Sequence, residues 1–458
     1  MAQLTAAESL GAYAAGLRYD DIPLDVLRRA KDCVIDTVAA TVFGHHAPAG
    51  RIIARHVAGL SSGGACHVLG SGTPPVHAEN AALANGTLAH ALELDSLRKP
   101  GAGVHPGAVL VPAALAVAQE HRLGGKELLT AIVAGCEILF RIGKATKHTA
   151  EARGFHAPGL TGPFGAAIAA GHLLGLDAEQ MTQALGIAGS MGGGLLQFAA
   201  QGEGGMVKRL HLGRAAAAGI TAAKLARDGF TGPSGVLEGK MGFLHAYCTD
   251  TDPAALTAGL GESFETLKIC FKRYPCHITA HTPVQAVADM QAAHGFSGAD
   301  VAEVIVEGTP KMAAMHGNQA PADSVAAQYS IAFCVAAALL HNPHQPETFT
   351  GTAQADPAVL DLCRRVQVQG NGGFASTWTT RTTLRLHDGR QFSATLENVP
   401  GMPALPFDTA QLRTKFLSLT GALGDGAEAL LERLEHIEGE ARLCWLAAAP
   451  VGGAHGLA

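Results

Sequence analysis

One loop of this sequence carries a high density of groups that can hold or move a proton. Between Asp95 and His105 the chain places a carboxylate, two cations and an imidazole among glycines. Glycine lets the backbone approach a ligand closely, and loops on rigid scaffolds carry much of a protein's chemistry. The loop is therefore predicted to be a site for a small anion.

Three other segments combine ionisable side chains with glycine or proline. They cover residues 153–159, 202–211 and 271–281. An imidazole or ammonium group ahead of a helix lies where backbone N–H groups and the helix dipole favour anions. The last of the three segments also lies where the composition of the chain changes, and ligand sites favour such junctions.

Together these segments offer six candidate site residues: Asp95, His105, His156, Lys208, Lys272 and His277. A substrate with two or three carboxylates needs cations to bind it. Abstraction of a proton next to a carboxylate needs a base, and the enolate charge that develops needs cations or hydrogen bonds. Lysines and imidazoles suit that task without a metal or an organic cofactor.

Each of these residues also has an ordinary structural interpretation. Asp95 can be a polar residue at the end of a helix, and His105 a turn residue. His156 and Lys208 can be surface residues at helix starts. His277 and His281 have the i,i+4 spacing of a metal-binding pair, but no third ligand is evident nearby.

Motifs for other ligands are weak or absent. His90 and Glu93 have the i,i+3 spacing of carboxylate-bridged metal bundles, but a single copy favours a core or capping role. Neither GxxxxGK[ST] nor a strand-placed GxGxxG occurs, so we expect neither ATP nor NAD. The formal net charge of −6 and the lack of long basic runs argue against nucleic-acid binding.

The positions of these residues depend on a helical framework. Apolar periodicity predicts helices at about 24–42, 75–92, 108–120, 126–145, 163–174, 178–190 and 206–228, joined by short connections. The scarcity of aromatics, at 5%, and the abundance of small residues favour tightly packed helices. No apolar run approaches the length of roughly 20 residues that a membrane-spanning helix needs.

The pattern changes near residue 268. Strands are expected at 302–307, 364–369, 382–387 and 391–396, and Asp388-Gly389 is a strong hairpin-turn signal. Helices at about 281–294, 323–341 and 356–364 interleave with them, and helices resume at 408–422 and 426–436. We therefore expect a mainly α fold: an all-α domain from residues 1–267 and 400–458, and a smaller α+β domain from 268–399.

The cysteines and the N-terminus indicate a location. Nine cysteines without a CxxC motif are typical of reduced thiols rather than a disulfide framework. No charged segment followed by an apolar one marks the N-terminus as a secretion signal. We expect a cytoplasmic protein without membrane association.

An ordered series of motifs resembles the MmgE/PrpD family, which includes 2-methylcitrate dehydratases, cis-aconitate decarboxylases and iminodisuccinate epimerases. The likeness covers nearly the whole chain. Its landmarks are HALELD at 90–95, VHPG at 104–107, GFH at 154–156, GPFG at 162–165, KRLHLGRA at 208–215, GFTGP at 229–233, LEG at 237–239, KRYPCH at 272–277 with His281, AQYSI at 327–331 and KF at 415–416.

This resemblance implies a large all-α domain built from both chain ends, a smaller α+β lid domain, a homodimer, and a pocket between the domains without metal or cofactor. The family's active-site positions fall on the six candidates named above. The implied chemistry is manipulation of a C–H bond next to a carboxylate of a small di- or tricarboxylate, with loss of water, loss of CO2 or reprotonation.

One departure bears on the reaction. Many relatives carry Asp-Asp-Thr where this chain has Asp95-Ser96-Leu97. A second carboxylate next to Asp95 would supply an acid, and Ser96 cannot. We expect a hydro-lyase that resembles 2-methylcitrate dehydratase, with an epimerase or a decarboxylase as alternatives and a non-catalytic homodimeric scaffold as the alternative of another class.

Roles follow for the six residues as a hypothesis. Asp95 and His156 transfer protons at the substrate carbon. Lys208, Lys272 and His105 bind carboxylates and stabilise enolate charge. His277 is the second acid or base, or a binding group contributed by the lid domain.

Overall fold

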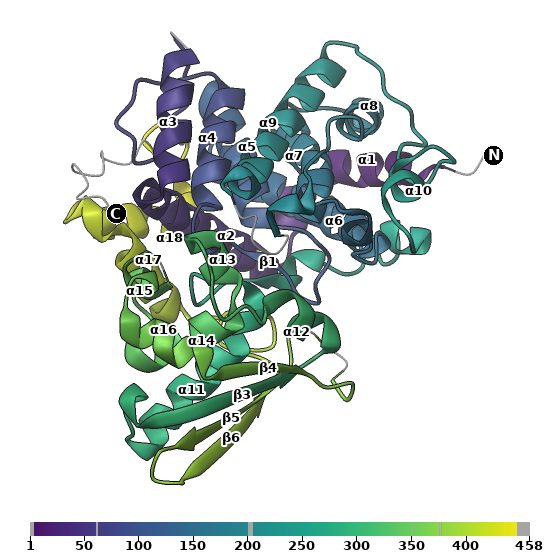
Figure 1. Ribbon diagram of the computed structural model, residues 1–458. Helices are drawn as coiled ribbons and strands as arrows, with labels where there is room; N and C mark the ends of the chain where they lie inside the picture. The colour runs from purple at the N-terminus through teal and green to yellow at the C-terminus, as the bar shows by residue number, and fades with distance from the viewer. Residues whose placement is uncertain are drawn as a thin grey trace.

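The computed structural model describes residues 4–60, 63–199, 205–349, 351–374, 376 and 378–446. The fold is mainly α, which confirms the prediction. Figure 1 shows a body of helices in its upper part and one four-stranded sheet with its own helices below. Among the described residues, every helix is too short or too polar to cross a bilayer.

The helical body is formed mainly by the first half of the chain. Its principal helices are α1 (Ala6–Gly16), α2 (Leu24–Phe43), α3 (Pro48–Leu60), α4 (Ala78–Ala89), α5 (Pro106–His121), α6 (Gly125–Ala145), α7 (Ala157–Leu173), α8 (Ala178–Ala188) and α9 (Val207–Arg227). Helices α4, α5 and α7 all pack against α9. Helices α1 and α3 were not among the predicted ranges.

Small residues allow these helices to approach closely. A Cβ on Gly213 of α9 would lie 2.1 Å from the backbone oxygen of Leu83 in α4, and one on Gly86 would lie 2.7 Å from the Cα of Gly213. The backbones of α4 and α9 therefore touch at this crossing. The contact fixes the end of α4, where the candidate loop begins, against the start of α9, which carries Lys208.

The last part of the described chain returns to the helical body. Helices α17 (Thr409–Thr420) and α18 (Gly426–Glu435) both pack on α2. From α17, the Lys415 ammonium donates to Asp36 Oδ1 at 2.5 Å and to the Leu94 carbonyl at 3.1 Å. Lys415, from the last part of the described chain, therefore binds the backbone directly before Asp95.

The four-stranded sheet has the order β4-β3-β5-β6. Its strands are β3 (Val301–Gly308), β4 (Val366–Gly370), β5 (Thr380–Leu386) and β6 (Gln391–Leu396). Strand β3 pairs parallel with β4 and antiparallel with β5, and β5 pairs antiparallel with β6. The turn at Asp388-Gly389 joins β5 to β6 as predicted, with Gly389 at φ +88°. Helices α11 (His281–His294), α14 (Ile331–Leu340) and α16 (Pro357–Arg364) pack beside the sheet (Figure 1).

Residues 323–341 form two helices rather than the single one predicted. Helix α13 (Ser324–Tyr329) ends before Ser330, whose backbone is extended and whose hydroxyl accepts from the Phe333 N–H at 3.0 Å. Ser330 therefore caps the N-terminus of α14, since a serine side chain can satisfy a free N–H group there. Short helices α10 (Phe243–Tyr247), α12 (Pro310–His316) and α15 (Gly351–Gln354) were also not predicted.

A second, two-stranded sheet joins the candidate loop to the segment that precedes Lys272. It pairs β1 (Leu97–Arg98) antiparallel with β2 (Ile269–Cys270), with Leu97 opposite Cys270. The pattern of the sequence did not predict these short strands. They bring two of the predicted site segments side by side.

Two large apolar cores lie on either side of this junction. One is formed by helical residues from Ala7 to Phe271 and from Leu412 to Leu446, and the other by residues from Tyr274 to Leu386. The domain boundaries at 267 and 400 stay a prediction.

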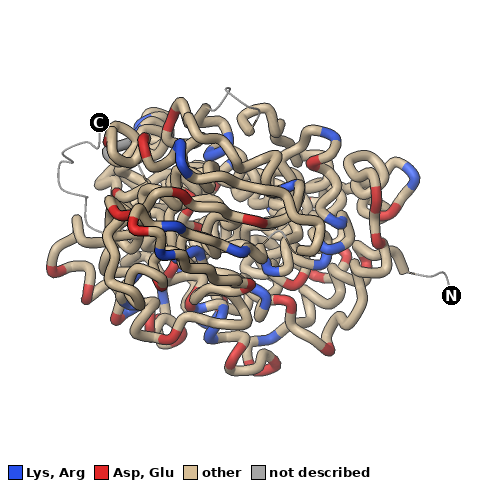
Figure 2. Tube along the Cα trace, turned by 60° about the horizontal axis from the view of Figure 1, so that its bottom comes forward, with Lys and Arg blue, Asp and Glu red and all other residues tan. Residues whose placement is uncertain are grey.

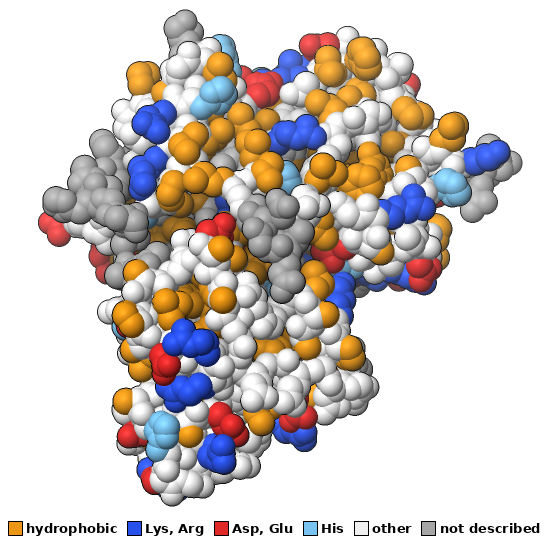
Figure 3. Space-filling model, in the orientation of Figure 1, with side chains coloured by type: hydrophobic (Ala, Val, Ile, Leu, Met, Phe, Trp, Pro, Cys, Tyr) orange, Lys and Arg blue, Asp and Glu red, His pale blue; other side chains and the backbone are white. Residues whose placement is uncertain are grey.

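The surface carries mixed charge and some apolar side chains. Figure 2 shows positive and negative residues interspersed along the chain, and Figure 3 shows hydrophobic side chains gathered over the helical part of one face. All nine cysteines are free thiols.

Candidate active site

A cavity of about 610 Å³ lies where the candidate loop, the starts of three helices and the α+β part of the chain meet. Five of the six predicted residues line it: His105, His156, Lys208, Lys272 and His277. The sixth, Asp95, lies directly behind the lining and has no exposed surface. The structure therefore brings together side chains that the sequence separates by up to 182 positions (95 to 277).

Local structure explains why these side chains converge. His105 and His156 are the N-cap residues of α5 and α7, each followed within two residues by a proline. Lys208 lies in the first turn of α9. Proline is well suited to the first turn of a helix, and N-cap residues keep an extended backbone. Three helices thus begin at the cavity, where their free N–H groups and dipoles favour an anion.

Asp95 holds two imidazoles. Its Oδ1 accepts from His90 Nδ1 at 2.9 Å and its Oδ2 accepts from His105 Nδ1 at 2.7 Å. Burial raises the pKa of Asp95, but the imidazoles of His90 and His105 and the Lys272 ammonium outweigh burial and hold that pKa well below its usual range. Asp95 is therefore an acceptor that fixes the His105 ring, which leaves Nε2 of His105 available to the cavity.

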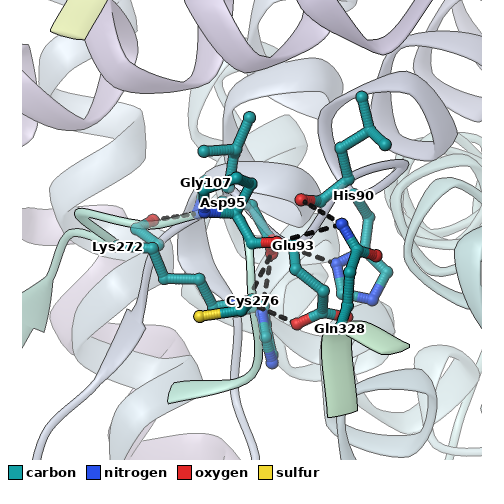
Figure 4. Close-up of polar contacts among 12 residues, drawn as sticks. His90, Glu93, Asp95, Gly107, Lys272, Cys276 and Gln328 are labelled. Atoms are coloured by element: carbon teal, nitrogen blue, oxygen red, sulfur yellow. Dashed lines mark hydrogen bonds and ion pairs between the residues drawn. The ribbon is translucent and has the colours of Figure 1, made fainter. Parts of the chain in front are cut away.

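Glu93 is a central residue of the site that the sequence analysis assigned to a core or capping role. Its backbone is left-handed, with φ 56°. Its carboxylate accepts from the Lys208 ammonium, from Arg209 Nη1 at 2.5 Å and from Lys272 Nζ at 2.7 Å. Figure 4 shows the side chain of Lys272 extending toward Glu93 and Asp95, which belong to one loop.

The cations around Glu93 outnumber the carboxylates. Lys208, Arg209 and Lys272 are all buried and face Glu93 and Asp95, which gives three cations for two carboxylates. Burial, then Arg209 and Lys272, lowers the pKa of Lys208 well below its usual range, and burial also lowers that of Lys272. One substrate carboxylate would balance the excess positive charge.

The imidazoles of His156 and His277 are neutral at neutral pH. Burial is the largest cause that lowers the pKa of His156 and of His277 well below the usual range. His277 Nδ1 lies 2.8 Å from Thr279 Oγ1, and its ring stacks on His316 with centroids 4.4 Å apart. A neutral imidazole can act as an acid through one nitrogen or as a base through the other, depending on its tautomer.

Tyr329 and His211 are two further residues that the sequence analysis did not single out. The ring of Tyr329 lies 4.6 Å from Lys208 Nζ and 4.6 Å from the His277 ring centroid. His211 Nδ1 lies 3.0 Å from His156 Nδ1. His211 stands three residues after Lys208, and this helical spacing on one face was a signal that could have drawn attention to it.

Ser96 does not reach the cavity. Its hydroxyl accepts from the Gly107 N–H at 3.1 Å and lies 3.6 Å from Cys33 Sγ, and the residue has no exposed surface. It therefore satisfies an N–H group in the first turn of α5. A carboxylate at this position would face the same N–H group rather than a substrate.

The cavity lining also carries paired charges from both parts of the fold. Glu151 of the helical body lies 2.9 Å from His148 Nε2 and 3.5 Å from the ammonium of Lys311 in α12. Gly103, at φ +63°, passes so close to His148 that a Cβ would lie 2.9 Å from that ring and 2.5 Å from the Ala157 Cβ. Close packing therefore requires glycine here.

Among the described residues, one group has metal-ligand spacing: His90, Asp95 and His105, whose ligand atoms lie within 4.8 Å of one another. Both Asp95 oxygens already accept hydrogen bonds, and the Lys272 ammonium lies 3.7 Å from one of them. A divalent cation would have to displace these contacts. His281 has the i,i+4 spacing from His277 that a metal-binding pair would need. It instead contacts the Cys276 carbonyl at 3.3 Å and the ring of Tyr274.

A mainly α body with an α+β part, and a cavity between them that is lined by cations and imidazoles, favour an anionic ligand. Residues 8–256 match the MmgE/PrpD N-terminal domain and residues 274–437 match the MmgE/PrpD C-terminal domain. The chain belongs to the MmgE/PrpD family, which confirms the resemblance.

Several cis-aconitate decarboxylases are similar to this chain over most of its length and of their own. A cis-aconitate decarboxylase of Aspergillus terreus is 30% identical over 443 residues, which cover 90% of this chain and 89% of the relative. Cis-aconitate decarboxylases of Homo sapiens and Mus musculus are 26% and 25% identical, over 94% of this chain and 91% and 90% of theirs. Family and relatives together indicate a lyase-type enzyme with a small-molecule substrate.

Proposed function

We propose that this protein is a lyase that decarboxylates a small unsaturated tricarboxylate of the cis-aconitate type. One observation carries the proposal. Among the described residues, the two carboxylates that line the cavity, Glu93 and Glu151, are both ion-paired, and they share the lining with five lysines, one arginine and five imidazoles. Such a cavity attracts carboxylates and can donate protons. The names of the relatives favour decarboxylation among the family's reactions.

The chemistry suits these groups. The bond from a carboxylate carbon to the substrate skeleton breaks, CO2 leaves, and the electron pair stays on the substrate carbon. That carbon then takes one proton. Cations placed where the negative charge develops lower the barrier, because electrostatic stabilisation in a water-poor site usually contributes most to catalysis. Lys208 and Lys272 bind the remaining carboxylates in this scheme.

The roles of the imidazoles follow from their partners. His156 delivers the proton to the substrate carbon, and His277, beside Tyr329, acts on the opposite side. His105 binds a substrate carboxylate through Nε2. Asp95 acts through His105 instead of contacting the substrate, which revises the hypothesis that Asp95 itself transfers a proton, because both of its oxygens lie behind the lining.

The hydro-lyase and epimerase alternatives stay predictions. The departure at position 96 bears on the choice of reaction only if this side chain can act on a substrate, but Ser96 faces Gly107 and Cys33 rather than the cavity. Its identity therefore does not select among the reactions. Neutral imidazoles can serve as acid and base for dehydration as well, so substrate assays must separate these reactions.

Proton NMR with cis-aconitate, citrate-like and aspartate-like acids in D2O is the decisive experiment. We expect cis-aconitate to give the alkene signals of a product that has lost CO2. Dehydration would give alkene signals from a citrate-like acid, and epimerisation would give only new diastereomer signals. An inert result with every acid, without any exchange of C–H for C–D, would favour the non-catalytic scaffold.

A variant pair tests whether the activity belongs to this cavity. Lys208→Ala removes a buried cation of the site and should lower kcat by about 10²-fold or more. Lys224→Ala, on the same helix, removes a cation that pairs with Glu79 and Glu120 outside the cavity and should leave kcat unchanged. Normal turnover in Lys208→Ala would remove that residue from the scheme.

We also propose that the protein works as a homodimer in the cytoplasm, as the family resemblance implies. Light scattering should then give twice the chain mass of 46.9 kDa. A mass equal to that of one chain would refute the dimer.

A further inference from the structure

The cavity histidine His156 has a buried imidazole partner that contributes nothing to the cavity lining. His211, in the second turn of α9, places Nδ1 3.0 Å from Nδ1 of His156, and the two ring centroids are 5.1 Å apart. The two residues are 5% and 6% exposed. Because Nδ1 of His156 is engaged in this way, Nε2 is its remaining nitrogen for a substrate.

The contact between two Nδ1 atoms requires that the rings share one proton. Burial is the largest cause that lowers the pKa of His156 well below the usual range and that of His211 to about 4. Both rings are therefore neutral at neutral pH, and each carries one N–H. At 3.0 Å, one Nδ1 must donate and the other accept. The Nε2 atoms of the two rings must then be in opposite states.

This coupling solves a chemical problem of the proposed reaction. A neutral imidazole that gives up its only proton becomes an imidazolate, which is a poor outcome in a buried site. His156 can act as an acid only if a second proton reaches its Nδ1 as the first leaves Nε2. His211 is the group within hydrogen-bond distance of that Nδ1.

We propose that His211 is a positioning residue, which sets the tautomer of His156 and passes a proton to it during each turnover. This inference rests on the proposed function. Before reaction, His211 donates its Nδ1–H to His156, whose Nε2–H faces the substrate.

The proton transfers balance. As the C–C bond breaks and CO2 leaves, the substrate carbon takes the Nε2 proton of His156. The Nδ1 proton of His211 moves to His156 Nδ1, and water protonates His211 Nε2. Every ring stays neutral, and one proton passes from solvent to product. After product release, water in the cavity protonates His156 Nε2, the shared proton returns from His156 Nδ1 to His211 Nδ1, and His211 Nε2 gives its proton to water. These three transfers restore the starting tautomers with both rings neutral.

The location of His211 fits this role. It does not line the cavity, and Arg214, three residues further along α9, is exposed. Gly194 packs so tightly on the His211 ring that a Cβ would lie 3.0 Å from Nδ1. That contact holds the ring in place, and glycine at φ +144° tolerates it.

The test separates a hydrogen bond from a proton path. His211→Asn keeps an amide that can donate or accept near the Nδ1 position but cannot pass a proton through. With cis-aconitate as substrate, we expect kcat to fall by about 10²-fold with little change in KM. His211→Ala should show the same loss, and added imidazole should restore turnover. His45→Asn, a buried histidine outside the cavity bonded to the Leu69 carbonyl, is the matched control and should keep wild-type kcat.

Two results would overturn the proposal: wild-type kcat in His211→Asn, or a loss in His211→Ala that imidazole does not restore. A substrate-free measurement keeps this test apart from that of the function. Nitrogen NMR of the wild-type protein labelled at histidine should show one protonated and one unprotonated Nδ1, joined by coupling across the hydrogen bond. Two unprotonated Nδ1 atoms would refute the pairing even if cis-aconitate proves not to be the substrate.

Discussion

Nδ1 of His105 lies 2.7 Å from Oδ2 of Asp95, a carboxylate with no exposed surface. The imidazole lines the cavity and the carboxylate does not. This pairing assigns the two residues different tasks, because a buried acceptor on Nδ1 fixes both the tautomer and the orientation of the ring.

Asp95→Asn should therefore impair catalysis without abolishing substrate binding. An amide can present its N–H to His105 and so select the opposite tautomer. We expect kcat to fall by about 10²-fold or more, with a smaller effect on KM. The measurement is steady-state kinetics with cis-aconitate. Asp250→Asn, which removes an exposed carboxylate paired with Lys147, is the control and should behave as wild type.

Glu93→Gln should destabilise the protein strongly. It leaves the buried cations Lys208, Arg209 and Lys272 with Asp95 as the remaining carboxylate. Removing one partner of a buried ion pair costs about 3–5 kcal/mol, so the urea midpoint should fall clearly. Glu303→Gln breaks a surface pair with Arg385 and should cost less than about 1 kcal/mol. Equal stabilities of the two variants would contradict the central role of Glu93.

Stability should decrease as the pH falls below about 6.5. The folded state holds the pKa of His211 and of His316 at about 4, and those of His156 and His277 well below the usual range. Between these values and about 6.5 the unfolded chain binds protons that the folded chain does not, so the free energy of unfolding falls with pH.

Asp32 and Asp36 act in the opposite direction, because burial raises the pKa of Asp32 to about 6 and also raises that of Asp36, but two carboxyls cannot offset the larger number of buried imidazoles. Urea unfolding at about pH 7 and about pH 5 checks the sign. A higher free energy of unfolding at the lower pH would show that other groups dominate.

Ser96→Ala should affect stability rather than activity. The hydroxyl satisfies the Gly107 N–H in the first turn of α5 and does not reach the cavity. Loss of such a contact typically costs about 1 kcal/mol. We expect a lower melting temperature and a kcat close to wild type. A large loss of kcat at full stability would place Ser96 in the reaction after all.

Much of the fold followed from local pattern. The periodic helices, the β5–β6 turn at Asp388-Gly389 and the return of the chain to helix after residue 400 are all present in the structure. The sequence pattern did not predict the structure where a single capping contact ends a helix or where two strands pair over only two residues. Ser330 divides one predicted helix into two, and β1 and β2 have two residues each, too few to show alternation.

The site was predictable in part. Glycine and proline beside ionisable groups marked five of the residues that line the cavity, and helix starts bring three of them, His105, His156 and Lys208, to a common edge. Glu93 could not be recognised, because its importance depends on a left-handed backbone and on three cations, all of them more than 110 positions away. The spacing of Lys208 and His211 was visible, but the partner of His211 was not.

The pairing of Leu97 with Cys270 and of Arg98 with Ile269 has a consequence for protein engineering. It fixes the register between the loop that carries His105 and the segment that carries Lys272, so neither segment can be exchanged without the other. Hybrid enzymes assembled from two relatives should fold and turn over only when residues 95–105 and 268–277 come from the same parent.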